Sequence, residues 1–215
     1  MIVLSAHYDH VGTRPAREQG EPPVVYNGAD DDASGVATVL ELAEAFAAAP
    51  APARTIVFLL ATGEERGILG TKHYIEHPPF PLEKTVCNLN FEMLGRPDEL
   101  VGGAGKLWLT GYERTTLGPA FAEKGIDVVA DQRLDQNFFM RSDNIVFVQK
   151  GIVGQTLSTY NLHEDYHQPT DDADALDYEH MQACARAGYQ AARLLSDGVV
   201  SPEWNEGEPP QRRRR

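Results

Sequence analysis

The sequence lacks the features that would place it among membrane, secreted or disulfide-rich proteins. It contains no run of about 18 or more apolar residues, so no membrane-spanning segment is predicted. It shows no basic and then apolar N-terminal stretch with a small-residue cleavage site, so no signal peptide is predicted and the chain as it stands would be cytoplasmic. Its two cysteines, Cys87 and Cys184, give neither a disulfide framework nor a CxxC metal motif, and both are expected to be core thiols.

Basic residues are also scarce relative to acidic ones. The 19 Lys and Arg residues against 32 Asp and Glu residues give a formal net charge of −13. Nucleic-acid binding needs a basic surface, so nucleic acid is not an expected partner, whereas an acidic chain is compatible with cation binding. The 215 residues, 42% hydrophobic and 24% charged, are typical of a globular domain that can bury a core. Residues 1–198 are expected to form one domain and residues 199–215 a disordered tail, because the chain from Ser201 onward is rich in proline and acidic residues and ends in arginines.

Apolar, strand-like runs alternate with amphipathic helical patterns along the chain. Residues 55–60 are apolar or β-branched without alternation, which predicts a strand buried on both faces. Alternating strands and helices predict an α/β protein, a three-layer α/β/α sandwich around a mostly parallel mixed sheet. Strands are expected at 1–6, 55–60, 85–93, 107–110, 126–129 and 152–157, helices at about 36–48, 69–74, 114–124, 144–150 and 178–195, and polar loops at 8–26 and 158–172.

Acidic and histidine side chains stand at the ends of the predicted strands and in the loops that follow them. The groups are His7 and Asp9, Asp30 to Asp32, Glu64 and Glu65, Glu92, and His163 to His167. In a doubly wound sheet these strand ends meet at one rim, where such folds bind their ligands. Each group alone also has a structural explanation: adjacent acids favour the positive N-terminus of a following helix, an Asp caps a helix, and a loop histidine is solvated.

Taken together, the groups favour a metal site over these separate explanations. Carboxylates crowded onto one rim repel one another, and a pair of divalent cations would relieve the repulsion. A mixture of imidazoles and carboxylates suits zinc, or cobalt and manganese, better than calcium or magnesium. Three protein ligands on each ion would leave an open position, which is typical of a catalytic rather than a structural site.

Six motifs occur in order between about Val3 and Asp177: HYDH, NGADDDASG, FLLATGEERGILGTKHY, NFEMLGR, SDN and EDYHQPTDD. In this order they resemble the di-zinc metallopeptidases of the aminopeptidase Y and bacterial leucyl aminopeptidase family, metallopeptidase family twenty-eight. The resemblance implies a zinc-exopeptidase-like fold, two zinc ions per chain, and hydrolysis of the N-terminal bond of a peptide with a free N-terminus. It leaves the preferred residue, the oligomeric state and the compartment open, although members of the family are often secreted.

The resemblance also implies a role for individual residues. His7 and Glu92 would complete one zinc site, Glu65 and His167 the other, and Asp31 would bridge the two ions. Asp31 is preferred to Asp30 because the bridging residue of the family stands four residues before the closing glycine, and its peptide bond to Asp32 would be cis. Glu64 would be the general base, and Asp9 would accept the spare ring N–H of His7. The remaining assignments are Tyr160 and Phe138 to the substrate pocket, and His10, His73, His77, His163 and His180 to surface or packing roles.

Two other functions share much of this pattern. A glutaminyl cyclase has the same fold but works with one zinc ion, and the uninterrupted GEERG motif and His7 argue against it. A peptidase-like binding module without activity would typically have lost ligands, whereas all five ligand positions and Glu64 are filled here. The chain departs from the family in carrying Glu92 where Asp is commoner. It also has little sequence before the strand that begins at residue 2, so the domain is expected to be short at its N-terminus or to find its missing sheet edge in a partner.

Overall fold

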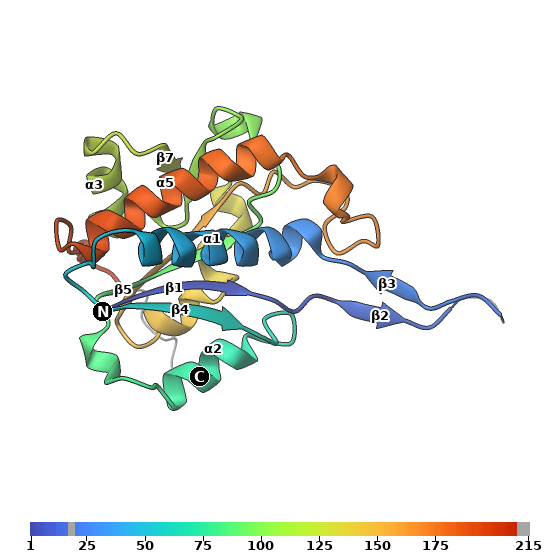
Figure 1. Cartoon of the computed structure of the whole chain (residues 1–215), viewed down its shortest axis with the longest axis horizontal. Helices are drawn as coiled ribbons and strands as arrows, with labels where there is room; N and C mark the ends of the chain where they lie inside the picture. The colour runs from blue at the N-terminus through green and yellow to red at the C-terminus, as the bar shows by residue number, and fades with distance from the viewer. Residues whose placement is uncertain (17–19, 210–215) are drawn as a thin grey trace.

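The computed structural model describes residues 1–16 and 20–209, and its body is a six-stranded sheet between two layers of helices (Figure 1). The strands of this sheet are β1 (Ile2–His7), β4 (Ile56–Ala61), β5 (Cys87–Glu92), β6 (Leu107–Leu109), β7 (Val128–Ala130) and β8 (Val153–Ser158). The helices are α1 (Gly35–Ala48), α2 (Leu69–Glu76), α3 (Leu117–Glu123), α4 (Asn144–Val148) and α5 (Tyr178–Ser196). Short helical turns lie at Ala29–Ser34, Leu82–Lys84, Glu99–Val101, Tyr112–Arg114, Leu134–Gln136, Phe138–Met140 and Ala173–Ala175.

The sheet has the strand order β4-β1-β5-β8-β6-β7. Every neighbouring pair is parallel except β6 and β8, which are antiparallel. The predicted α/β sandwich around a mostly parallel mixed sheet is therefore confirmed. Within the described residues, no helix combines the length and the apolar content needed to cross a bilayer.

Alternate residues of β1 enter opposite cores, as the two-residue period of a strand requires. Ile2 and Leu4 pack in the cluster formed with α1 and α5, whereas Val3 packs against residues of α2 and α4 on the other face. Gly188 lets α5 approach the sheet closely, because a Cβ at this position would lie 2.6 Å from the ring of Phe91. Helices therefore cover both faces of the central strands.

Strand β4 differs from its prediction in one respect. A fully buried strand was expected, but β4 is the edge of the sheet, and the five residues from Ile56 to Leu60 are only half-buried. Helices cover its two faces, which explains the continuous apolar run. Among the described residues β1 is its single neighbour, so its outer edge stays open. The sequence pattern reports covered faces and cannot distinguish a central strand from an edge strand.

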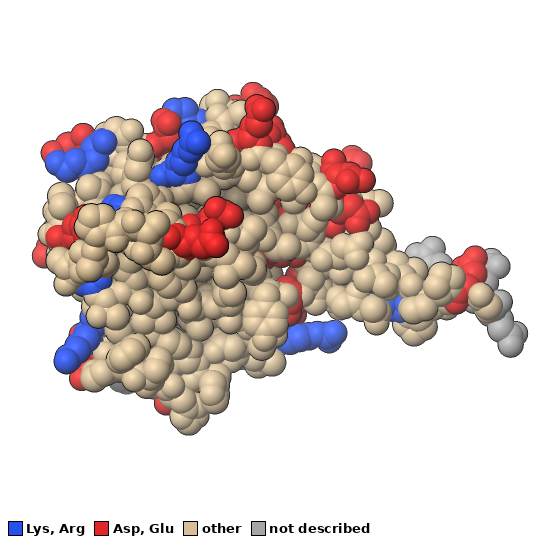
Figure 2. Space-filling view, in the orientation of Figure 1, with Lys and Arg blue, Asp and Glu red and all other residues tan. Residues whose placement is uncertain are grey.

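The predicted polar loop at 8–26 contains a short antiparallel hairpin that projects from the body (Figure 1). Its strands, β2 (Gly12–Arg14) and β3 (Val24–Tyr26), are here called the arm. In the view of Figure 2 the arm is mostly uncharged, and acidic side chains are visible where it joins the body. The run Val24-Val25-Tyr26 favours a strand, but it is too short to stand out among the surrounding glycines and prolines.

The C-terminal segment also differs from its prediction, because residues 201–209 pack on the body instead of forming part of a disordered tail. Trp204 donates its indole N–H to the carbonyl of Gly151 at 2.9 Å and lies opposite Thr115 in an antiparallel bridge. The backbone N–H groups of Thr116 and Asn205 close this bridge on the carbonyls of Glu203 and Arg114. Arg114 forms an ion pair with Glu208 at 2.7 Å. These specific contacts outweigh the disorder-promoting composition, and residues 210–215 lie outside the described part of the chain.

Candidate metal centre

The carboxyl ends of the parallel strands bring the predicted site residues to one rim of the sheet. His7 is the last residue of β1 and Glu92 is the last residue of β5. Directly after β4, Gly63 has a φ of 72°, a left-handed conformation that glycine adopts without steric cost. This turn presents Glu64 and Glu65 at the same rim.

Asp31 lies between two histidines and offers a different oxygen to each. Its Oδ1 is 3.3 Å from Nε2 of His7, and its Oδ2 is 3.1 Å from Nε2 of His167. The peptide bond between Asp31 and Asp32 is cis, as predicted. A carboxylate with one histidine on each oxygen has the arrangement that a bridging ligand between two ions requires.

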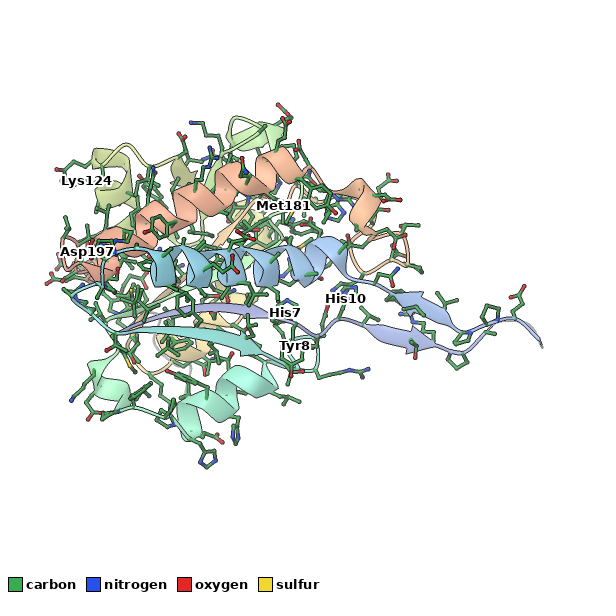
Figure 3. The ribbon with its side chains drawn as sticks, in the orientation of Figure 1. His7, Tyr8, His10, Lys124, Met181 and Asp197 are labelled. Atoms are coloured by element: carbon green, nitrogen blue, oxygen red, sulfur yellow. The ribbon has the colours of Figure 1, made fainter. Side chains whose placement is uncertain are left out.

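Glu65 lies on the His167 side of Asp31, beside a histidine for which only a surface or packing role was expected. Its Oε1 is 3.0 Å from Nε2 of His167 and 3.0 Å from Nδ1 of His10. His10, Asp31, Glu65 and His167 offer one ligand atom each, all within 4.8 Å of one another. Figure 3 shows His7 and His10 at the same end of the sheet, where the chain leaves β1 for the arm. His10 is therefore part of the cluster.

Glu92 belongs to a buried polar network inside the sheet. Asn90 donates from Nδ2 to Glu92 Oε2 at 3.3 Å and to Ser142 Oγ at 2.9 Å. Burial, with a contribution from the charge of Asp31, raises the pKa of Glu92 to about 7 against the opposing effect of His7. A cation beside this carboxylate would favour its ionised form.

Asp9 contacts His7 as predicted, but mainly through its backbone carbonyl instead of its carboxylate. The ring nitrogen Nδ1 of His7 lies 3.0 Å from the backbone carbonyl of Asp9 and 3.7 Å from its carboxylate. Because a carbonyl only accepts, Nδ1 of His7 is the donor and Nε2 faces Asp31 as the free ligand atom. The Asp9 carboxylate instead accepts the backbone N–H groups of Glu64 at 3.0 Å and Glu65 at 3.3 Å. Asp9 thus fixes the turn that carries the two glutamates as well as the ring of His7.

The ionisable side chains of the site lie close enough to shift one another's pKa values. Burial, with a further contribution from Glu92, raises the pKa of Glu64 to about 8. The carboxylates of Asp31 and Glu65, 3.1 Å and 3.0 Å from Nε2, raise the pKa of His167 to about 9. Burial lowers the pKa of His7, but its hydrogen bonds to Asp31 and Asp9 outweigh this and raise it overall. A cation beside these carboxylates would favour their ionised forms.

The donor set fits zinc. Several buried polar atoms of the cluster make no hydrogen bond within the described residues: both ring nitrogens of His10, Oε1 of Glu65 and Nε2 of His167. Buried polar atoms normally have partners, so a group of orphaned nitrogen and oxygen atoms facing one another needs an explanation. Imidazole nitrogens and carboxylate oxygens are ligands that zinc accepts. Zinc would satisfy the atoms that the protein leaves unpaired.

Sequence reasoning missed Asp171, which positions the bridging residue. Asp171 is fully buried, and its carboxylate accepts the backbone N–H groups of Asp30 at 3.0 Å and Asp31 at 3.1 Å. His163, expected to have only a surface or packing role, lies 3.0 Å from the carboxylate of Asp30 behind the cluster. In the sequence, Asp171 is marked only by its place in the motif EDYHQPTDD, from which a role was inferred for His167 alone.

Replacing Asp171 by alanine is expected to weaken both the fold and the metal site. Two buried N–H groups would lose their acceptor, at a cost of about 1–3 kcal/mol each, and Asp31 would lose its anchor. Zinc affinity is expected to fall about 10- to 100-fold, as for other residues that orient a ligand. Urea denaturation and a zinc competition titration would measure the two effects. Asp174→Ala, at an exposed position nearby, is the control, and unchanged zinc affinity in Asp171→Ala would contradict the positioning role.

An apolar pocket adjoins the cluster. Met93, Trp108, Phe138 and Tyr160 form a buried group and line the same cavity as Glu64. The ring of Phe138 stacks on Trp108 with centroids 5.2 Å apart and meets Tyr160 edge-on at 5.7 Å. The structure thus places both predicted pocket residues beside the cluster, and Trp108 and Met93 join them.

The layered fold and the rim of histidines and carboxylates together define an α/β protein with a candidate metallohydrolase centre. The chain belongs to the peptidase family M28, whose family model matches residues 1–192. The family predicted from the six motifs is therefore confirmed.

Proteins similar in sequence to this chain include peptidases from fungi and bacteria. The chain is 31% identical over 213 residues to a vacuolar membrane protease of Schizophyllum commune, covering 96% of this chain and 21% of that protein. It is 27% identical over 225 residues to aminopeptidase YwaD of Bacillus subtilis, covering 97% of this chain and 42% of that protein. The chain thus spans less than half the length of either relative.

A similar solved structure is that of BSAP, a zinc aminopeptidase from Bacillus subtilis. It has a TM-score of 0.71 and 24% identity, and the match covers 93% of this chain and 47% of that chain. At this identity the likeness concerns the fold, and it agrees with the three-layer sandwich built from the strand order above.

Proposed function

We propose that this domain is a zinc-dependent aminopeptidase that holds two zinc ions. The observation that carries the proposal is the position of Asp31, with His7 on one carboxylate oxygen and His167 on the other. His7, Asp31 and Glu92 would hold one ion, and Asp31, Glu65 and His167 the other. When bound, the ions would polarise the scissile carbonyl and lower the pKa of the attacking water molecule.

Glu64 would carry the proton in this reaction. It lines the cavity beside the two groups of ligands, and the turn at Gly63 and the acceptor Asp9 fix its backbone. Its carboxylate would take a proton from the attacking water as the new C–O bond forms. It would then deliver the proton to the amine nitrogen as the peptide C–N bond breaks.

The pocket beside Glu64 would select the substrate. Its aromatic walls, including Trp108 and Tyr160, suit an apolar side chain on the first residue of a peptide. The carboxylates at the rim would attract the positively charged amine of a free N-terminus. A peptide with an apolar first residue and an unblocked amine is therefore the expected substrate class.

Hydrolysis of a leucyl anilide by metal-free protein, followed as zinc is added back, tests the proposal. Activity should rise with zinc and disappear when the amine of the substrate is acetylated. Activity on the acetylated substrate would contradict an aminopeptidase, and no activity at any zinc concentration on a panel of N-terminal residues would contradict a peptidase. A glutamine-leading peptide distinguishes the single-zinc alternative, because a cyclase would convert it to a pyroglutamyl peptide.

A further inference from the structure

We propose that His10 is a protein ligand of the metal held by Asp31, Glu65 and His167, a role that rests on the metal centre of the proposed function. The second metal site then has four protein donors: His10 Nδ1, Asp31 Oδ2, Glu65 Oε1 and His167 Nε2. The first site, with His7, Asp31 Oδ1 and Glu92, has three.

The distances between the four donor atoms carry the proposal. His10 Nδ1 lies 3.0 Å from Glu65 Oε1 and 3.6 Å from Asp31 Oδ2. His167 Nε2 lies 3.0 Å from the same glutamate oxygen and 3.1 Å from the same aspartate oxygen. A tetrahedral zinc ion with bonds of about 2.0–2.1 Å places its ligand atoms about 3.3 Å apart. These four separations are therefore those of neighbouring ligands on one ion.

The burial of His10 points to a ligand as well. Its side chain is only 7% exposed, and within the described part of the chain neither of its ring nitrogens has a hydrogen-bond partner. His180 provides a contrast, since it is also buried but accepts the backbone N–H of Gly105 at 2.8 Å through Nδ1. The ring of His180 is thus satisfied by the protein, whereas neither ring nitrogen of His10 is.

The surroundings of His10 hold its ring toward the cluster. Its ring meets that of His167 edge-on, with centroids 5.4 Å apart. Gly28 leaves room behind it, because a Cβ at position 28 would lie 2.6 Å from Cγ of His10. Both residues flank the arm, and Figure 3 places His10 where the chain enters it. The ring therefore lies between Gly28 and His167, with Nδ1 directed at Glu65.

Two imidazoles in the second site and one in the first make the two sites unequal. Four protein donors would close a tetrahedral shell, so the open position for substrate and water would belong to the His7 site. Two nitrogen ligands also favour zinc over magnesium or calcium more strongly than one does. We therefore expect the second site to fill first and to bind zinc more tightly.

Zinc X-ray absorption tests the ligand count without any substitution. The wild-type protein is loaded with one equivalent of zinc, and the number of imidazoles around the ion is measured. About two imidazoles per zinc are expected. A value near one, or no tight zinc binding, would overturn the proposal.

Calorimetric zinc titration of variants provides an independent test. His10→Ala is expected to weaken the tighter of the two binding events by at least about 10-fold. His10→Gln keeps a polar side chain at this position but is a poor zinc ligand, so it should not restore the affinity. Wild-type affinity in either variant would overturn the proposal, and His73→Ala, on the exposed surface of α2, is the matched control. Because these readouts do not depend on turnover, tight two-imidazole binding by a protein without peptidase activity would contradict the proposed function alone.

Discussion

Replacing Glu64 by glutamine should abolish hydrolysis while leaving zinc binding intact. Glutamine keeps the size and polarity of the side chain but cannot accept the proton of the attacking water. General acid–base catalysis typically contributes about 10²- to 10⁴-fold, so kcat is expected to fall by at least this factor while KM changes little. Steady-state kinetics on a leucyl anilide, with zinc stoichiometry on the same sample, would measure both quantities.

Variants of two other glutamates test whether the loss of activity is specific to the role of Glu64. Glu65 is expected to be a ligand, so its replacement should remove metal as well as activity, whereas Glu64→Gln should remove activity alone. Glu76→Gln, which neutralises an exposed acid at the end of α2, is the control for a change of one charge and should leave kcat and KM unchanged. Full activity in Glu64→Gln would show that another group moves the proton.

Removing zinc should lower the thermal stability of the protein by a large amount. An ion present at about 1,000 times its dissociation constant stabilises the folded state by about 4 kcal/mol. For a domain of this size each kcal/mol shifts Tm by about 2–4 °C, so the metal-free protein is expected to melt about 8–16 °C lower. Thermal unfolding with and without a chelator measures the difference. Magnesium should not replace zinc in this assay, because three of the proposed ligands, His7, His10 and His167, are imidazoles.

The stability of the metal-free protein should also fall as the pH rises from about 5 to 8. The pKa values of Glu64 and Glu92 are raised by burial to about 8 and about 7 in the folded protein, above their ordinary value of 4.5. The folded state then binds protons that the unfolded state has released, so raising the pH favours unfolding. The raised pKa of His7 acts in the same direction, and the lowered pKa of Asp31 has its effect only at lower pH. Bound zinc should make the stability less dependent on pH, because it favours the ionised carboxylates. A stability of the metal-free protein that increases from pH 5 to 8 would contradict the raised pKa values of Glu64 and Glu92.

The sequence predicted the parts of the fold that follow from local periodicity. The helix expected at 178–195 is α5 at Tyr178–Ser196, and the strand expected at 152–157 is β8 at Val153–Ser158. The convergence of His7, Glu65 and Glu92 could also be predicted, because the ends of parallel strands share one rim. Their roles as ligands, and that of Glu64 as the base, stay predictions.

The features that the sequence did not predict depend on contacts between distant segments. His10 stands three residues after His7, and nothing in its local pattern shows that the chain turns its ring back toward Glu65. Asp171 acts through two backbone N–H groups more than a hundred residues away, a contact with no periodic signature. The open edge of β4 is invisible for the same reason: strand order is a property of the whole sheet.

That open edge has a consequence for the behaviour of the protein in solution. The half-buried strand β4, Ile56–Ala61, carries neither proline nor lysine, the residues that commonly discourage pairing at an edge. Its outer backbone groups can template another extended segment, so concentrated samples are expected to associate edge to edge. We therefore expect association to depend on the edge of β4 and thermal stability to depend on the metal centre.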